Sequence, residues 1–224
     1  MTADERGTRS ERRPRLLGWR SALLGVFAAL IIWGLIRALI VDFYYIPSGS
    51  MEPLLQPGDR IAVARTAFAN RAVQRGDVVV FDGRGSFAPL DSGRGWLLDA
   101  VQGAGEWLGL VPNETVYVKR VLGVAGDHVM CCTSGGQLAV NGTPLDEPYI
   151  YPGDAPSAVR FDVVVPAGRL WLLGDHRADS ADSRSLLGAP GGGLVRADRV
   201  IGEPISILWP LDRLGPVNTM KGHQ

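Results

Sequence analysis

The stretch RGDVVVF, residues 75–81, shows the pattern from which the fold class of this chain is predicted. A Gly-Asp pair, which favours a tight turn, leads directly into β-branched and aromatic residues, which favour an extended strand. The same device recurs as PGDRIAVA at 57–64 and as AGDHVM at 125–130. The sequence therefore predicts several strands, each introduced by a turn.

Further stretches of the chain have the composition of short strands. They are VYVKRVLGV (116–124), FDVVVP (161–166), RLWLLGDH (169–176), ISILW (205–209) and LAVNGTPL (138–145), the last with an Asn-Gly hairpin signal. Short strands at this density, without helices between them, predict a mainly β domain with antiparallel sheets or a partly closed barrel. Residues 82–112 break the pattern, and we expect them to form an insertion.

The composition limits the classes of function. The 224 residues carry 23 Lys+Arg and 23 Asp+Glu, so no net field favours nucleic acid. Cys131 and Cys132 are neighbours, which excludes a disulfide framework. A redox switch is one possibility, but we expect two buried thiols because the ring that would join them is small and strained. No cluster of Cys and His has the spacing of metal ligands, so we expect neither a metal nor another cofactor.

An apolar run near the N-terminus predicts a membrane anchor. Residues 21–36 carry no charge, and the run reaches residue 41 if Arg37 extends to the headgroups. Crossing a bilayer takes ~20 predominantly apolar residues. Arginines at positions 6, 9, 12, 13, 15 and 20 precede the run, and positive charge stays cytoplasmic. We therefore expect a cytoplasmic segment 1–20, a single transmembrane anchor 21–41 in the cell membrane, and an extracytoplasmic β-rich domain 42–224.

A cleavable signal peptide is the alternative for this run. The first small-x-small triplet beyond it is Ser48-Gly49-Ser50, whose last residue lies nine positions after Val41. Small hydroxyl residues beside glycine suit either a tight bend or a nucleophile on an exposed corner. Cleavage at this triplet would remove that motif, so an uncleaved anchor is preferred.

A nucleophilic serine needs a base, and the sequence offers two. His176 has Asp175 and Asp179 nearby, which leaves a Ser-His-Asp site open. Lys119 lies within a predicted strand whose two faces are both largely apolar. A desolvated lysine has a lowered pKa and can accept a proton, whereas an edge lysine with its amine in water cannot do so readily. Spacing alone leaves these possibilities open.

Four motifs follow the apolar run in a fixed order: PSGSM (47–51), RGDVVVF (75–81), YVKRVLGVAGD (117–127) and GDHRADSADSR (174–184). Together they resemble bacterial type I signal peptidases over residues 45–184. The resemblance implies that Ser50 is the nucleophile and Lys119 the general base. It also implies that the Ser48 hydroxyl and the Ser50 backbone N–H form the oxyanion hole.

The last motif supplies supporting residues by the same resemblance. Ser180 matches a serine that orients the lysine, and Asp182 and Arg184 match charged residues that support the site. These two could pair with each other or with Arg120. His176 and residues 177–179 depart from the Asn- and Asp-rich pattern of the family, which puts only details of this loop in doubt.

The resemblance implies a membrane-bound serine endopeptidase that removes signal peptides from exported precursor proteins through an acyl-enzyme. Its expected partners are these precursors and membrane lipid, and Ile46 and Met51 could line a pocket for substrate side chains. Two alternatives remain at this point. One is a membrane-tethered β binding module without catalysis, and the other is a self-cleaving Ser-Lys regulator.

Overall fold

The computed structural model describes residues 18–88, 115–189 and 191–219 of the chain. The chain divides into two compact units, Met1–Ala38 and Leu39–Gln224. The basic segment expected at residues 1–20 lies almost wholly outside the described residues. The same is true of most of the insertion expected at residues 82–112.

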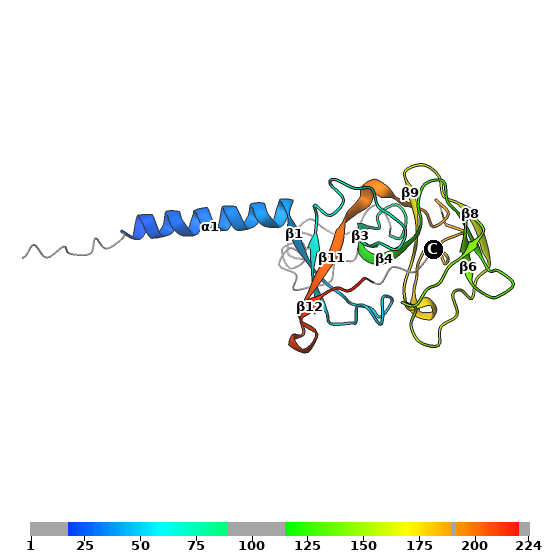
Figure 1. Cartoon of the computed structure of the whole chain (residues 1–224). Helices are drawn as coiled ribbons and strands as arrows, with labels where there is room; N and C mark the ends of the chain where they lie inside the picture. The colour runs from blue at the N-terminus through cyan, green and yellow to red at the C-terminus, as the bar shows by residue number, and fades with distance from the viewer. Residues whose placement is uncertain (1–17, 89–114, 190, 220–224) are drawn as a thin grey trace, which may run out of the picture. The chain divides into compact units, whose positions relative to one another are not determined.

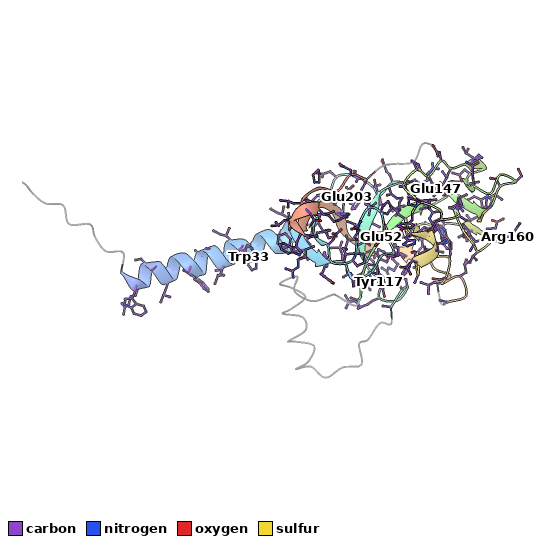
Figure 2. The ribbon with its side chains drawn as sticks, turned by 90° about the horizontal axis from the view of Figure 1, so that it is seen from below. Trp33, Glu52, Tyr117, Glu147, Arg160 and Glu203 are labelled. Carbon is purple, nitrogen blue, oxygen red and sulfur yellow. A yellow bond between two sulfur atoms is a disulfide. The ribbon has the colours of Figure 1, made fainter. Side chains whose placement is uncertain are left out.

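The first unit is built around helix α1, Trp19–Leu39. This helix has no acidic residue in its first turn, and its large apolar side chains are exposed, Leu24 and Phe27 among them. Figure 2 shows one of these side chains, Trp33, on the helix. Across the ranges that the structure describes, no helix combines the length and the apolar character needed to cross a bilayer.

The second unit confirms the expected mainly β, antiparallel fold. Its larger sheet has the strand order β1-β2-β11-β3-β4-β9-β10, with β12 paired to β11 (Figure 1). The strands are β1 Val41–Tyr45, β2 Arg60–Ala64, β3 Val78–Asp82, β4 Val116–Gly123, β9 Arg169–Leu173, β10 Val195–Arg196, β11 Val200–Trp209 and β12 Gly215–Pro216. Every paired neighbour in this sheet is antiparallel.

A smaller antiparallel sheet has the order β7-β6-β5-β8. Its strands are β5 His128–Cys131, β6 Leu138–Val140, β7 Thr143–Pro144 and β8 Phe161–Val164. The predicted Asn-Gly hairpin joins β6 to β7, and both turn residues adopt positive φ, 53° at Asn141 and 81° at Gly142. Positive φ at both positions is what a type I′ turn requires. Three short 3-10 helices complete the described elements: η1 Arg177–Asp179, η2 Ala197–Arg199 and η3 Leu211–Arg213.

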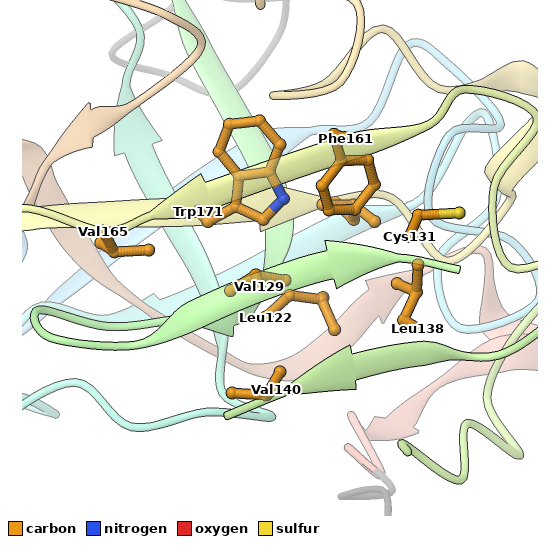
Figure 3. Close-up of a cluster of buried hydrophobic side chains, with 9 residues drawn as sticks. Leu122, Val129, Cys131, Leu138, Val140, Phe161, Val165 and Trp171 are labelled. Atoms are coloured by element: carbon orange, nitrogen blue, oxygen red, sulfur yellow. The ribbon is translucent and has the colours of Figure 1, made fainter. Parts of the chain in front are cut away.

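A shared hydrophobic core joins the two sheets (Figure 3). Trp171 of β9 is fully buried and stacks at a tilt against Phe161 of β8, with ring centroids 5.4 Å apart. The other buried members are Leu122, Val129, Cys131, Leu138, Val140, Val165 and Leu173. Because this core includes Leu122 of β4 together with Trp171 and Leu173 of β9, it helps to fix the strands from which the candidate site is built.

The expectation of two thiols is wrong, because Cys131 and Cys132 form a disulfide. The expectation of thiols rested on the strain of the small ring that a disulfide between neighbouring cysteines closes. In the folded chain Cys131 belongs to the core between the sheets and Cys132 packs against that core, so both sulfur atoms are held at the same place at the end of β5.

Candidate active site

Ser50 lies in a loop that follows β1 and is held on both sides. The backbone N–H of Ile46 donates to the carbonyl of Asp59 (2.9 Å), and the N–H of Gly58 donates back to the carbonyl of Ile46 (2.9 Å). Ile46 and Met51 are both buried in one hydrophobic cluster. Ile46 and Met51 are therefore held in place, and they fix the short loop between them that carries Ser48 and Ser50.

Lys119 reaches this corner from the middle of β4. Its backbone pairs with Val79 of β3, and its side-chain Nζ lies 2.6 Å from Ser50 Oγ. The two residues are 69 positions apart in the sequence. Only 3% of Lys119 is exposed, so the amine is desolvated and does not extend into water from a sheet edge.

Burial lowers the pKa of the Lys119 amine to about 8, because desolvation disfavours the ammonium form. Negative charge on Asp182 and Asp175 opposes this shift but does not cancel it. A lysine with this pKa is partly neutral near pH 7, and a neutral amine can accept the hydroxyl proton of Ser50.

Ser48 places a second hydroxyl at the same corner. Its Oγ lies 3.5 Å from Ser50 Oγ, at the outer limit of a hydrogen bond. The N–H of Ser50 donates no hydrogen bond to any residue in the described part of the chain. One hydroxyl and one backbone donor are thus both available beside the nucleophile.

Asp182 and Arg184 form a buried bidentate ion pair with each other. Arg184 Nη2 lies 2.7 Å from Asp182 Oδ2, and Arg184 Nε lies 2.8 Å from Oδ1. Asp182 also accepts the backbone N–H of Gly174 (3.0 Å). Burial opposes ionisation of Asp182, but the hydrogen bonds and charge of Arg184 hold the pKa of this carboxyl below its usual value. Through the bond from Gly174, Asp182 links the segment after β9 to the end of that strand.

Gly174 is a site residue that the sequence reasoning did not single out. A Cβ on Gly174 would collide with the Ser180 hydroxyl and with the backbone carbonyl of Ser50. Ser180 Oγ is buried and has no hydrogen-bond partner within the described residues, so its contact with Lys119 remains a prediction. The only sequence signal was the glycine itself at the end of a predicted strand, which can mark a close backbone approach.

Comparison with known proteins identifies the family. The family model "Signal peptidase, peptidase S26" matches residues 19–209. The chain belongs to this family. It is 36% identical to a protein of Mycobacterium leprae described as "Probable signal peptidase I", with 96% of this chain and 84% of that protein covered.

Other relatives agree with this assignment. Signal peptidase I of Mycobacterium tuberculosis is 37% identical, with 91% of this chain and 76% of the relative covered. Signal peptidase IB of Staphylococcus aureus is 28% identical, with 92% and 98% covered. Family membership confirms the expected serine endopeptidase activity on signal peptides, and the alternative of a binding module without catalysis is set aside.

In this signal peptidase the ring of His176 makes no hydrogen bond to Ser50 within the described residues. The ring stacks on Tyr151, with centroids 4.0 Å apart, and its two nitrogens lie 3.9 Å from carboxylates of Glu52 and Asp154. The contact of His176 with Ser50 is made by its backbone N–H, which donates to the Ser50 carbonyl (3.2 Å). Within the described ranges, no Ser-His-Asp arrangement includes Ser50.

Arg120, the neighbour of the lysine, has a different partner from the two considered from sequence. It forms a buried bidentate pair with Asp175, at 2.6 and 2.7 Å, and its guanidinium lies over the ring of Tyr149 at 3.9 Å. Arg120 and Lys119 therefore have different partners. Arg120 links β4 to the turn after β9 through Asp175, whereas Lys119 contacts Ser50.

A cavity of about 320 Å³ opens beside Ser50 and Lys119. Two extended segments line it, one around β1 and the serine loop and the other at the start of β4. Its lining residues are Tyr44, Tyr45, Ile46, Pro47, Ser48, Ser50, Met51, Val116, Tyr117, Val118 and Lys119. The lining is mostly apolar and includes both Ile46 and Met51. Figure 2 shows Tyr117 and Glu52 within this β-rich unit.

Proposed function

We propose that Ser50 and Lys119 are the catalytic dyad of this signal peptidase. The observation that supports it is the 2.6 Å approach of a buried lysine Nζ to Ser50 Oγ. Neutral Lys119 would take the hydroxyl proton as Ser50 Oγ attacks the scissile carbonyl of the precursor. A carbon–oxygen bond forms, and the carbonyl electron pair moves onto the oxygen.

In this proposal the Ser50 N–H and the Ser48 hydroxyl donate to the resulting oxyanion. Collapse of the tetrahedral intermediate would expel the amine of the mature protein, and the Lys119 ammonium would give that amine its proton. The signal peptide is then held as an ester on Ser50. Attack by water, deprotonated in turn by Lys119, would release it and restore the dyad.

The cavity supports binding of an extended substrate. A peptide laid in it would run beside residues 44–48 on one side and 116–119 on the other, and backbone hydrogen bonds to such segments are a common mode of peptide recognition. We propose that Ile46 and Met51 contact the small side chains that precede the scissile bond. A mostly apolar cavity suits small apolar groups better than charged ones.

We further propose that the apolar run from residue 21 anchors the enzyme in the cell membrane, with residues 1–20 cytoplasmic and the β-rich unit outside. The helical part of the run ends at Leu39 and not at the expected residue 41, because Val41 already pairs with Ala64 as the first residue of β1. The support is the exposed apolar surface of α1 and six arginines in the first 20 residues, five before the helix and Arg20 in its first turn. Protease treatment of sealed inverted vesicles tests the orientation. We expect removal of the N-terminal segment alone, and loss of the β-rich unit would contradict the proposal.

The dyad is tested by cleavage of a purified secretory precursor in detergent. We expect wild type to cut after a small-x-small site. Ser50→Ala and Lys119→Ala should each lower kcat by about 10³-fold or more while both remain folded by circular dichroism. Normal cleavage by Lys119→Ala would refute the assignment of the base. Cleavage of a separate precursor also distinguishes this enzyme from a self-cleaving regulator.

A further inference from the structure

A second and larger cavity, of about 610 Å³, shares no lining residue with the dyad cavity. It lies among the loop after β2, the turn after β4, the start of β9 and helix η2. Its walls are largely apolar, with Phe68, Val73 and Leu170 among them. A cavity of this size and composition is typical of a ligand site, and the dyad mechanism does not use it.

The polar lining of this cavity is entirely cationic. Arg65, Arg71 and Arg169 line it, and no acidic residue does. Arg71 is held by ion pairs to Asp77 and Glu203, and Arg65 lies 3.3 Å from an oxygen of Asp42.

Arg169 differs from the other two arginines. It is half-buried, and its guanidinium makes no ion pair with any carboxylate of the described residues. Its neighbour across the β9–β10 pair is Arg196, which is itself paired with Asp198. Among the described residues the charge of Arg169 therefore has no carboxylate partner, and a ligand with an anionic head and an apolar body would complement it.

One arginine of the cavity is hydrogen-bonded to the segment that precedes β1. The helix ends at Leu39, and the carbonyl of the next residue, Ile40, accepts the backbone N–H of Arg65 (2.9 Å). Ile40 and Arg65 both belong to the β-rich unit, so this hydrogen bond holds Arg65 to the first residues of that unit. Phospholipids of the membrane proposed above are amphiphiles with an anionic head and an apolar body.

We propose that this cavity binds an anionic phospholipid, with the headgroup phosphate at Arg169 and Arg65 and an acyl chain against the apolar wall. The inference rests on the proposed membrane anchor. Guanidinium groups bind phosphate through paired N–H donors, and the apolar wall gives the chain a place outside water. A zwitterionic lipid has a phosphate but no net charge, so we expect the cavity to bind it more weakly.

The test is lipid binding to the full chain in a neutral detergent, measured by native mass spectrometry. The probes are palmitoyl-oleoyl phosphatidylglycerol, the matching phosphatidylcholine, and inorganic phosphate. We expect wild type to bind one phosphatidylglycerol at least about 10-fold more tightly than phosphatidylcholine, and phosphate not to displace it. Arg169→Glu should remove this preference.

Arg160→Glu is the matched control, because Arg160 is exposed and lies outside the cavity. It makes the same charge change and should bind lipid as wild type does. Ala125→Trp, on the cavity wall, fills the space without changing charge, and it should also weaken binding. Equal binding of both lipids by wild type, or equal loss in Arg160→Glu and Arg169→Glu, would overturn the proposal.

Peptide cleavage in the same detergent separates this proposal from the proposed function. Arg169→Glu should cleave as wild type does, and Ser50→Ala should bind phosphatidylglycerol as wild type does. If wild type prefers phosphatidylglycerol but cleaves no precursor, the cavity assignment stands and the proposed function fails. If wild type cleaves but does not discriminate between the lipids, the proposed function stands and the cavity assignment fails.

Discussion

At the scale of single residues, the chemistry depends on the protonation of one amine. Lys119 is 3% exposed, and its desolvation brings the pKa of the amine to about 8. An exposed lysine, with a pKa near 10.4, would be protonated almost entirely at neutral pH and would be a poor base. Burial beside Ser50 thus gives the proposed dyad a base that works close to neutral pH.

This pKa predicts the pH profile of the enzyme. Only neutral Lys119 accepts the Ser50 proton, so kcat/KM should rise tenfold per pH unit below about 8 and level off above it. The measurement is kcat/KM for a peptide without groups that titrate between pH 6 and 10. A profile that is already flat at pH 6 would mean that another group is the base.

Ser48 predicts a different kinetic effect. Its hydroxyl is placed to donate to the oxyanion, so Ser48→Ala should lower kcat by about 10²–10³-fold with little change in KM. Ser48→Thr keeps a hydroxyl and should retain more activity than Ser48→Ala. Ser48 is exposed, so neither change should alter the melting temperature noticeably. A rise in KM at constant kcat would place Ser48 in substrate binding instead.

At the scale of elements, we expect the segment after β9 to position Ser50 of the proposed dyad. It is fixed by the Asp182–Arg184 pair, by the Gly174 N–H on Asp182, and by the Arg120–Asp175 pair from β4. The segment therefore follows two strands of the larger sheet. Any shift of its backbone moves the carbonyl of Ser50, which accepts the N–H of His176.

Gly174→Ala tests this coupling. The added Cβ would collide with the Ser50 carbonyl and the Ser180 hydroxyl, and misplacement of reacting groups by about 1 Å can cost 10²-fold in rate. We expect kcat to fall by about that factor. Gly188→Ala is the control, because a Cβ there meets nothing within 4 Å. Equal activity of the two variants would show that the segment does not position the dyad.

At the scale of the whole molecule, one core makes the two sheets of the β-rich unit depend on each other. Trp171 comes from the larger sheet, and Phe161 comes from the smaller one. Trp171→Ala would leave a large void between them, which typically costs 3–5 kcal/mol.

We expect this substitution to lower the free energy of unfolding by about that amount, in one transition that both sheets share. Denaturant unfolding followed by far-ultraviolet circular dichroism is the measurement. Trp209→Ala is the control, since half of that side chain is exposed. Two separate transitions in the variant would show that the sheets are independent.

Several strands and one hairpin could be predicted from the sequence alone. Turn pairs followed by β-branched runs predicted β2, β3 and β5, and the Asn-Gly pair predicted the hairpin of the smaller sheet, because backbone preferences act over a few residues. β1 was missed, since its Asp and aromatic residues follow an apolar run and resemble a membrane interface. Four motifs in order were enough to indicate the family.

The partners and the burial of the polar side chains, by contrast, could be seen only in the tertiary structure. Sequence reasoning left Lys119 equally open to an edge or a desolvated position, and it offered Arg120 as a partner for Asp182 or Arg184. The fold instead buries Lys119 against a serine 69 positions away and pairs Arg120 with Asp175. The physical reason is that desolvation and ion pairing depend on what surrounds an atom, and these surroundings come from strands distant in the sequence.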